Sequence, residues 1–156
     1  MIERKKLEKL ITDTLKSIGL YSDEALYLIL GTIAKESLMG KYRKQIGGGP
    51  ALGICQIEPS TFYDIIQHFL KYNPMLKNLV MKEAGVEDLM AEYLENNDVL
   101  SICFCRFQYR RYPEKLPKIH DIEGMAALWK KRYNTYKGSG TVDGFIKTYE
   151  KYIKNG

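Results

Sequence analysis

The chain has 156 residues, a length that suits one domain with a single sizeable core. Hydrophobic residues make up 45% and charged residues 28%, which is typical of a soluble globular protein and excludes a largely disordered chain. The formal net charge of +5 favours an anionic partner such as nucleic acid, a membrane surface or an anionic polymer, although many enzymes are simply basic. We expect one domain over residues 1–156.

The first part of the sequence predicts two helices. Apolar residues recur at helical spacing from Leu7 to Ile18, and Gly19 follows as a stop signal. Ser22 is a good N-cap for the next helix, whose residues 25–34 are apolar nearly all round. A helix of this kind is usually buried in the middle of a domain.

A glycine-rich segment, residues 39–59, interrupts the helical pattern. Loops this long inside a compact domain are often functional. Residues 51–57 could form a short strand, and we expect a small β element within residues 45–58.

The remaining sequence predicts further helices and no repeat or linker. We expect them to open at Pro59, near residues 75–82 and 86–95, at Asn97 or Asp98, at Asp121 and at Thr141. The predicted fold is therefore mainly helical.

The cysteines and histidines do not indicate a metal site. Cys55, Cys103 and Cys105 form an odd set without metal-ligand spacing, so we expect reduced and mostly buried thiols, as in a protein made in a reducing cytoplasm. His68 and His120 show no partner spacing. Because the sequence also has no phosphate-cradling glycine loop and no nucleophile–base pattern, we expect no metal and no cofactor.

Glu36 is the sharpest chemical signal in the sequence. It continues the inward face that carries Leu28 and Ile33, in the last turn of its helix. Desolvation and the negative end of the helix dipole should both raise its pKa. A carboxylic acid that stays protonated near neutral pH is what cleavage of a glycosidic bond requires. The alternative is a glutamate that reaches solvent or pairs with Lys35 or Arg43.

Three motifs occur in an informative order. Residues 34–37 read Ala-Lys-Glu-Ser, residues 47–61 read Gly-Gly-Gly-Pro-Ala-Leu-Gly-Ile-Cys-Gln-Ile-Glu-Pro-Ser-Thr, and residues 126–135 read Ala-Ala-Leu-Trp-Lys-Lys-Arg-Tyr-Asn-Thr. In order and rough spacing they resemble the lytic transglycosylase and goose-type lysozyme superfamily, across residues 22–153. The particular variants look most like those of phage-encoded members.

The resemblance implies a lysozyme-like fold, mainly helical, with a small β element beside an active-site cleft. The cleft would lie between residues 45–58 and the helices that end at Glu36 and Tyr133. Glu36 would be the general acid, or acid and base in turn. Ser37 would orient Glu36 or contact substrate, and a hydroxyl that satisfies the helix end is the alternative.

The same resemblance implies four further substrate-binding positions. Gln56 and the backbone around Ile54 would line the cleft and bind sugar groups, whereas Tyr133 and Asn134 would contact the substrate from the opposite side. Local roles are the alternatives: a strand-end hydrogen bond for Gln56, and packing or helix capping for the other two side chains. Cys55 stands where the family usually has methionine, so part of the cleft wall could differ.

Glu58 bears on the product of the reaction. Goose-type lysozymes carry an acidic residue at the matching place, where it holds the attacking water, and a second carboxylate permits hydrolysis. Without one, the 6-hydroxyl of the sugar attacks and an anhydro product forms. If residues 54–58 were a strand, Glu58 would share a face with Gln56. The alternative is a solvated residue that complements the N-terminus of the helix at Pro59. The resemblance to phage-encoded members slightly favours the transglycosylase. Asp64 is a weaker second carboxylate.

The resemblance thus implies an enzyme, a peptidoglycan lytic transglycosylase or a muramidase, that cleaves the β-1,4 bond between N-acetylmuramic acid and N-acetylglucosamine. Its partners would be glycan strands and, in a phage particle, tail or virion proteins. Basic clusters near Arg110 and Lys131 come without a recognition motif, so we do not expect nucleic acid. The alternative from a different class is a wall-binding or structural virion protein without catalysis.

The N-terminal residues are charged and the following segment is amphipathic, which predicts neither a signal peptide nor a membrane span. A wall-cleaving enzyme of this kind would be made in the host cytoplasm and would reach the wall through a phage particle or a lysis pore.

Overall fold

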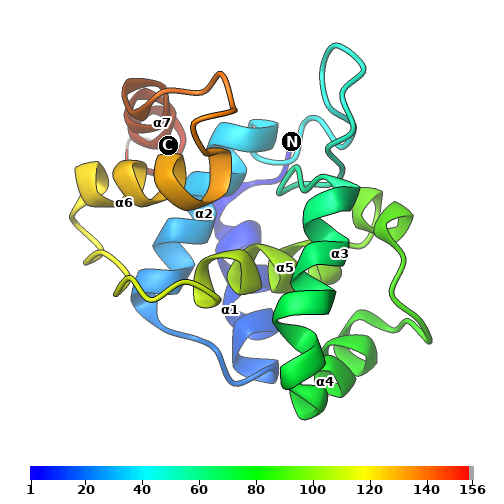
Figure 1. The fold of residues 1–156 in the computed structure, drawn as a ribbon. Coiled ribbons are helices and arrows are strands. Elements are labelled where there is room, and N and C mark those ends of the chain that lie inside the picture. The colour runs from blue at the N-terminus through cyan, green and yellow to red at the C-terminus, as the bar shows by residue number, and fades with distance from the viewer. Residues whose placement is uncertain (155–156) are drawn as a thin grey trace.

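The structure, a computed structural model, describes residues 1–154 and is mainly helical (Figure 1). Its α-helices are α1 (Arg4–Ser17), α2 (Asp23–Ser37), α3 (Pro59–His68), α4 (Pro74–Ala84), α5 (Asp98–Arg110), α6 (Ile122–Leu128) and α7 (Val142–Tyr149). Two short 3-10 helices are η1 (Leu70–Tyr72) and η2 (Ala91–Glu95). Two π-helical turns, η3 (Trp129–Asn134) and η4 (Glu150–Lys154), extend α6 and α7.

Most helix starts follow the capping residues in the sequence. The side chains of Ser22, Asn97, Asp121 and Thr141 each accept a backbone N–H at the start of their helices. Each such cap stabilises its helix by about 1 kcal/mol. The helix expected over residues 86–95 is reduced to η2, since only its last part closes into helical turns.

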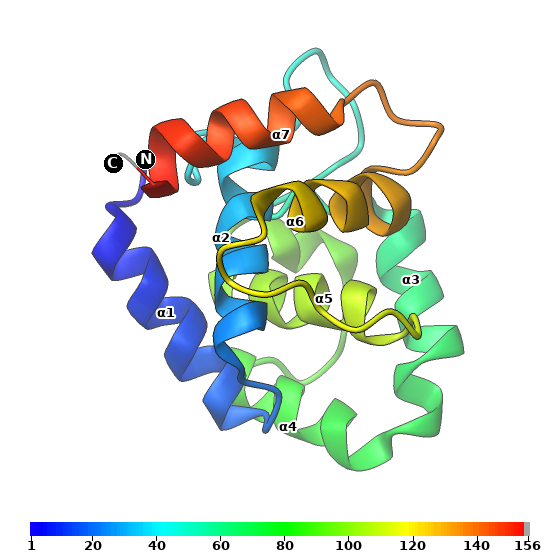
Figure 2. The ribbon, with the colours of Figure 1, turned by 90° about the vertical axis from the view of Figure 1, so that its left-hand side faces the viewer.

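The centre of the molecule is α2, which packs against α1, α5 and α7. Figures 1 and 2 show it running through the middle, with α6 and α7 on one side and α3 and α4 on the other. Gly31 lets α7 lie close, because a Cβ there would come within 2.6 Å of a ring carbon of Phe145. The helix predicted over residues 25–34 is part of α2 and is buried, as expected. This packing fixes the position of the C-terminal end of α2.

The segment expected to form a small β element, residues 45–58, contains no strand. Leu52 instead makes isolated antiparallel bridges to Lys44 and to Ile57. Gln56 has a φ of 50°, a left-handed conformation that breaks an extended run. The prediction of a short strand is therefore wrong, and this part of the fold is a set of turns held against the helices.

Two expectations drawn from composition can be compared with residues 1–154. All three cysteines are free and buried, as expected. No helix in this part of the chain is long and apolar enough to cross a membrane.

Candidate active site

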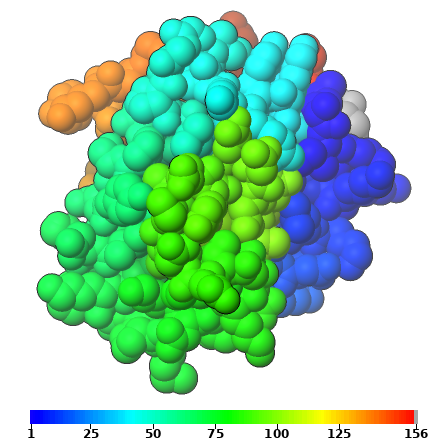
Figure 3. Space-filling model, turned by 90° about the vertical axis from the view of Figure 1, so that its right-hand side faces the viewer, coloured from blue at the N-terminus to red at the C-terminus, as the bar shows by residue number. Residues whose placement is uncertain are grey.

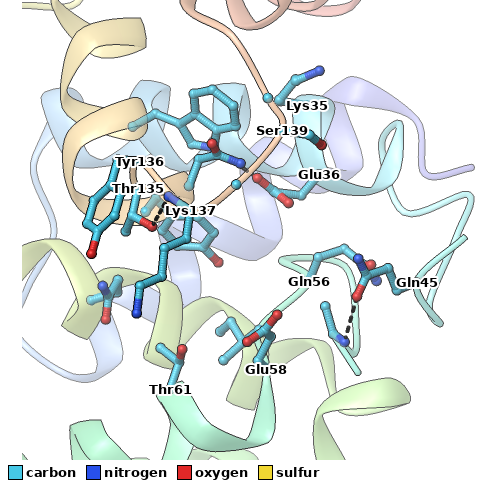
Figure 4. Close-up of a pocket in the computed structure, with 18 of the residues that line it drawn as sticks. Lys35, Glu36, Gln45, Gln56, Glu58, Thr61, Thr135, Tyr136, Lys137 and Ser139 are labelled. Carbon is cyan, nitrogen blue, oxygen red and sulfur yellow. Dashed lines mark hydrogen bonds between the residues drawn. The ribbon is translucent and has the colours of Figure 1, made fainter. Parts of the chain in front are cut away.

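A cleft of about 680 Å³ opens mainly between three parts of the chain. These parts are the end of α2, the segment from Gln45 to Thr61, and the chain from Trp129 to Gly140; Gln108, Arg111 and Tyr112 at the end of α5 complete the lining. A smaller hollow of about 170 Å³ continues beyond Glu36. Figure 4 shows the labelled side chains around the cleft, with Glu36 and Glu58 on opposite sides of it. The cleft lies between the segments that the sequence indicates, and its size suits a bound ligand.

The carboxyl group of Glu36 lies in this cleft at the end of α2 and is largely surrounded by protein. Desolvation raises its pKa to about 7, although the indole N–H of Trp129 and the charge of Lys35 act in the opposite direction. Near neutral pH a large fraction of the group therefore carries a proton. The alternative pairing with Arg43 does not occur, because that guanidinium binds Asp98 at 2.5 Å.

Trp129 is the functional residue that the sequence reasoning missed. Its Nε1 donates a hydrogen bond of 2.9 Å to Oε2 of Glu36. The indole is buried against Phe145 at the start of η3, so it fixes the direction of the carboxyl group. A signal was available: Trp129 is the one tryptophan in the sequence, it stands inside a matched motif, and a buried indole N–H needs an acceptor.

Tyr133 joins the helical side of the cleft to the turn segment. Its hydroxyl donates to the carbonyl of Cys55 at 2.6 Å, and its ring stacks on Tyr109 with centroids 5.3 Å apart. Burial raises the pKa of the Tyr133 hydroxyl, which therefore stays protonated as a donor. Tyr133 lines the cleft as predicted, but its hydroxyl is already bound to the protein.

Ser37 and Ile54 are not among the residues that line the cleft. Ser37 is fully buried; its hydroxyl donates to the carbonyl of Ile54 at 2.6 Å and accepts the N–H of Gly40 at 2.9 Å. These bonds tie the end of α2 to the turn segment. Both residues therefore support the cleft from beneath and do not line its surface.

Gln56 and Asn134 do line the cleft. Gln56 donates from Nε2 to the carbonyl of Gly53 at 2.9 Å, which leaves its side-chain oxygen without a partner among residues 1–154. The Asn134 oxygen accepts from Lys130 Nζ at 2.7 Å. Each amide thus keeps hydrogen-bonding capacity beside the cleft.

Glu58 is exposed and lines the same cleft. It occupies the N-cap position of α3 without a side-chain capping bond, and no ion pair or hydrogen bond holds its carboxylate within residues 1–154. Asp64, the weaker carboxylate candidate, does not line the cleft; it pairs with Arg111, which does. Of the two, only Glu58 shares the cleft with Glu36.

Comparisons of the chain with protein-family models, with curated proteins and with solved structures find no match.

Proposed function

We propose that this protein is an enzyme that cleaves the β-1,4 bond between N-acetylmuramic acid and N-acetylglucosamine in peptidoglycan. The observation that carries the proposal is the carboxyl group of Glu36, which lines an open cleft with a pKa of about 7. A protonated carboxylic acid can protonate the leaving oxygen of a glycosidic bond. The three sequence motifs add the substrate class, since each contributes residues to this cleft or its support.

In the proposed reaction, Glu36 gives its proton to the glycosidic oxygen as the bond from that oxygen to the anomeric carbon breaks. An oxocarbenium-like state forms on the muramoyl sugar. The indole N–H of Trp129 helps to orient Glu36 and stabilises the carboxylate left behind. A nucleophile then bonds to the anomeric carbon and loses its proton. If Glu36 takes this proton, the acid is restored directly; if Glu58 takes it, Glu58 releases the proton to solvent and Glu36 regains one from solvent before the next turnover.

The nucleophile is either water or the 6-hydroxyl of the same sugar. The resemblance to phage-encoded members slightly favours the 6-hydroxyl, as in a transglycosylase. The free carboxylate of Glu58 across the cleft from Glu36 supports the second candidate, a muramidase in which Glu58 activates water. The products distinguish the two chemistries, because attack by the 6-hydroxyl gives fragments that lack one water.

The test is digestion of purified sacculi by the wild-type protein, with mass spectrometry of soluble muropeptides. Release of muropeptides is expected, and binding without release would support the wall-binding alternative. Ordinary reducing ends, with Glu58→Gln lowering the rate by about 10²-fold or more, would assign Glu58 as the base. Anhydro products that persist at an unchanged rate in Glu58→Gln would assign the transglycosylase. Glu87→Gln, at an exposed residue outside the cleft lining, is the matched control.

We further propose that the protein acts at the bacterial wall as a phage lysis enzyme or as part of a virion. The match of the motif variants to phage-encoded members supports this setting.

A further inference from the structure

The loop that follows η3, residues 135–140, is firmly attached to the catalytic side of the cleft. Lys130 Nζ donates to the carbonyl of Gly138 at 3.0 Å. A Cβ on Gly140 would come within 2.5 Å of a ring carbon of Trp129, so the loop packs directly on the indole that binds Glu36. Figure 3 shows the orange part of the chain, which includes this loop, standing out beyond the edge of the molecule.

Lys137 extends from this loop into the cleft, where it is one of the lining residues (Figure 4). Its ammonium group makes no ion pair or side-chain hydrogen bond with any residue of the described chain. Its one side-chain interaction is with the ring of Tyr136, whose centroid lies 5.9 Å away. That ring is 87% exposed, so it screens the ammonium little.

Two other cations, Arg111 and Lys35, line the cleft. Arg111 forms an ion pair with Asp64 at 2.5 Å. The charge of Lys35 lowers the pKa of Glu36, but its ammonium group lies beside the start of α7, where a Cβ on Gly144 would come within 3.2 Å of it. Lys137 therefore leaves an uncompensated positive charge beside the place where a glycan would lie, and a bound anion would complement it.

We propose that Lys137 binds a carboxylate carried by the muramoyl residue, either its lactyl carboxylate or a carboxylate of the attached peptide. This inference rests on the proposed function. Muramoyl residues differ from plain N-acetylglucosamine in these acidic substituents, so Lys137 would select strands that carry free carboxylates. The anchored loop fixes the backbone that carries Lys137, so only the side chain has to lose conformational freedom on binding.

The test uses soluble glycan strands, either untreated or with their carboxylates converted to amides by carbodiimide and ammonia. We expect Lys137→Met to lower kcat/KM on untreated strands by about tenfold, the scale of one charged hydrogen bond, and to leave amidated strands unaffected. Lys137→Arg should retain the preference of the wild type. Lys147→Met, at an exposed lysine of α7 outside the cleft lining, is the matched control.

On strands that carry peptides the lactyl carboxyl is tied up in the amide to the peptide, so only the peptide supplies free carboxylates there. An amidase hydrolyses that amide, which removes the peptide and frees the lactyl carboxylate. An effect of Lys137→Met that persists on amidase-treated strands identifies the lactyl carboxylate as a ligand, and an effect that is lost identifies the peptide. Equal effects of the substitution on untreated and amidated strands, or no effect on either, would overturn the inference. If the wild type cleaves neither substrate, the proposed function fails separately. The role of Lys137 is then tested by a binding assay with untreated strands. Equal retention of these strands by the wild type and by Lys137→Met would also overturn the inference.

Discussion

Glu36 shows which properties of a candidate site residue can be predicted from the sequence. Helical periodicity alone places it on the inward face of an apolar helix, and desolvation there raises its pKa as predicted. The hydrogen bond from Trp129 could not be predicted in the same way, because the two residues lie 93 positions apart and meet only through packing. Local patterns thus single out Glu36, whereas its hydrogen-bond partner depends on the tertiary fold.

The raised pKa of Glu36 predicts a pH-dependent gain in stability for Glu36→Gln. Between the ordinary value of 4.5 and about 7, the folded state holds a proton that the unfolded state has lost, so stability falls as pH rises through this window. The free energy of unfolding of Glu36→Gln should therefore match the wild type near about pH 4 and exceed it by roughly 1–3 kcal/mol near about pH 8. Urea unfolding at both pH values measures this, and the same difference at both would refute the assigned pKa.

At the scale of elements, the sequence predicts helix starts better than it predicts the turn segment. Caps such as Ser22 and Thr141 act on backbone groups a few residues away, so a local pattern suffices. The strand expected over residues 51–57 fails because Gly53 and Gln56 adopt left-handed conformations. The turn is closed by local bonds from Gln56 to the carbonyl of Gly53, and it packs against α2 and the carbonyl of Leu94, contacts that no short window contains.

Gly53→Ala tests the close approach of this turn segment to the helical body. Gly53 has a φ of 81°, and a Cβ there would lie 2.2 Å from the carbonyl oxygen of Leu94. We expect the left-handed strain of about 1–2 kcal/mol plus about 1–3 kcal/mol for the clash. Gly85→Ala is the control, because Gly85 has a φ of 68° but open space around it. Chemical denaturation of both variants gives the comparison, and equal losses would show that Gly53 does not pack against Leu94.

At the scale of the whole molecule, the cleft depends on three segments that are far apart in sequence. Their order could be predicted from the motifs, and Glu36, Gln56, Glu58, Tyr133 and Asn134 do line one cleft. The supporting roles of Ser37 and Ile54, and the unpaired charge of Lys137, appear only after packing. A sequence motif does not distinguish side chains that line the cleft from side chains that are buried beneath it.

The most direct test of the central claim is the activity of Glu36→Gln on purified peptidoglycan, measured as soluble muropeptides released, beside the wild type and Glu87→Gln. Glutamine keeps the shape of Glu36 and can still accept the Trp129 hydrogen bond, but it cannot give up a proton. We predict that release falls by about 10²–10⁴-fold in Glu36→Gln, the scale of general acid catalysis, while its thermal midpoint stays equal or rises. Release by Glu36→Gln at the wild-type rate would contradict the assignment of Glu36 as the acid.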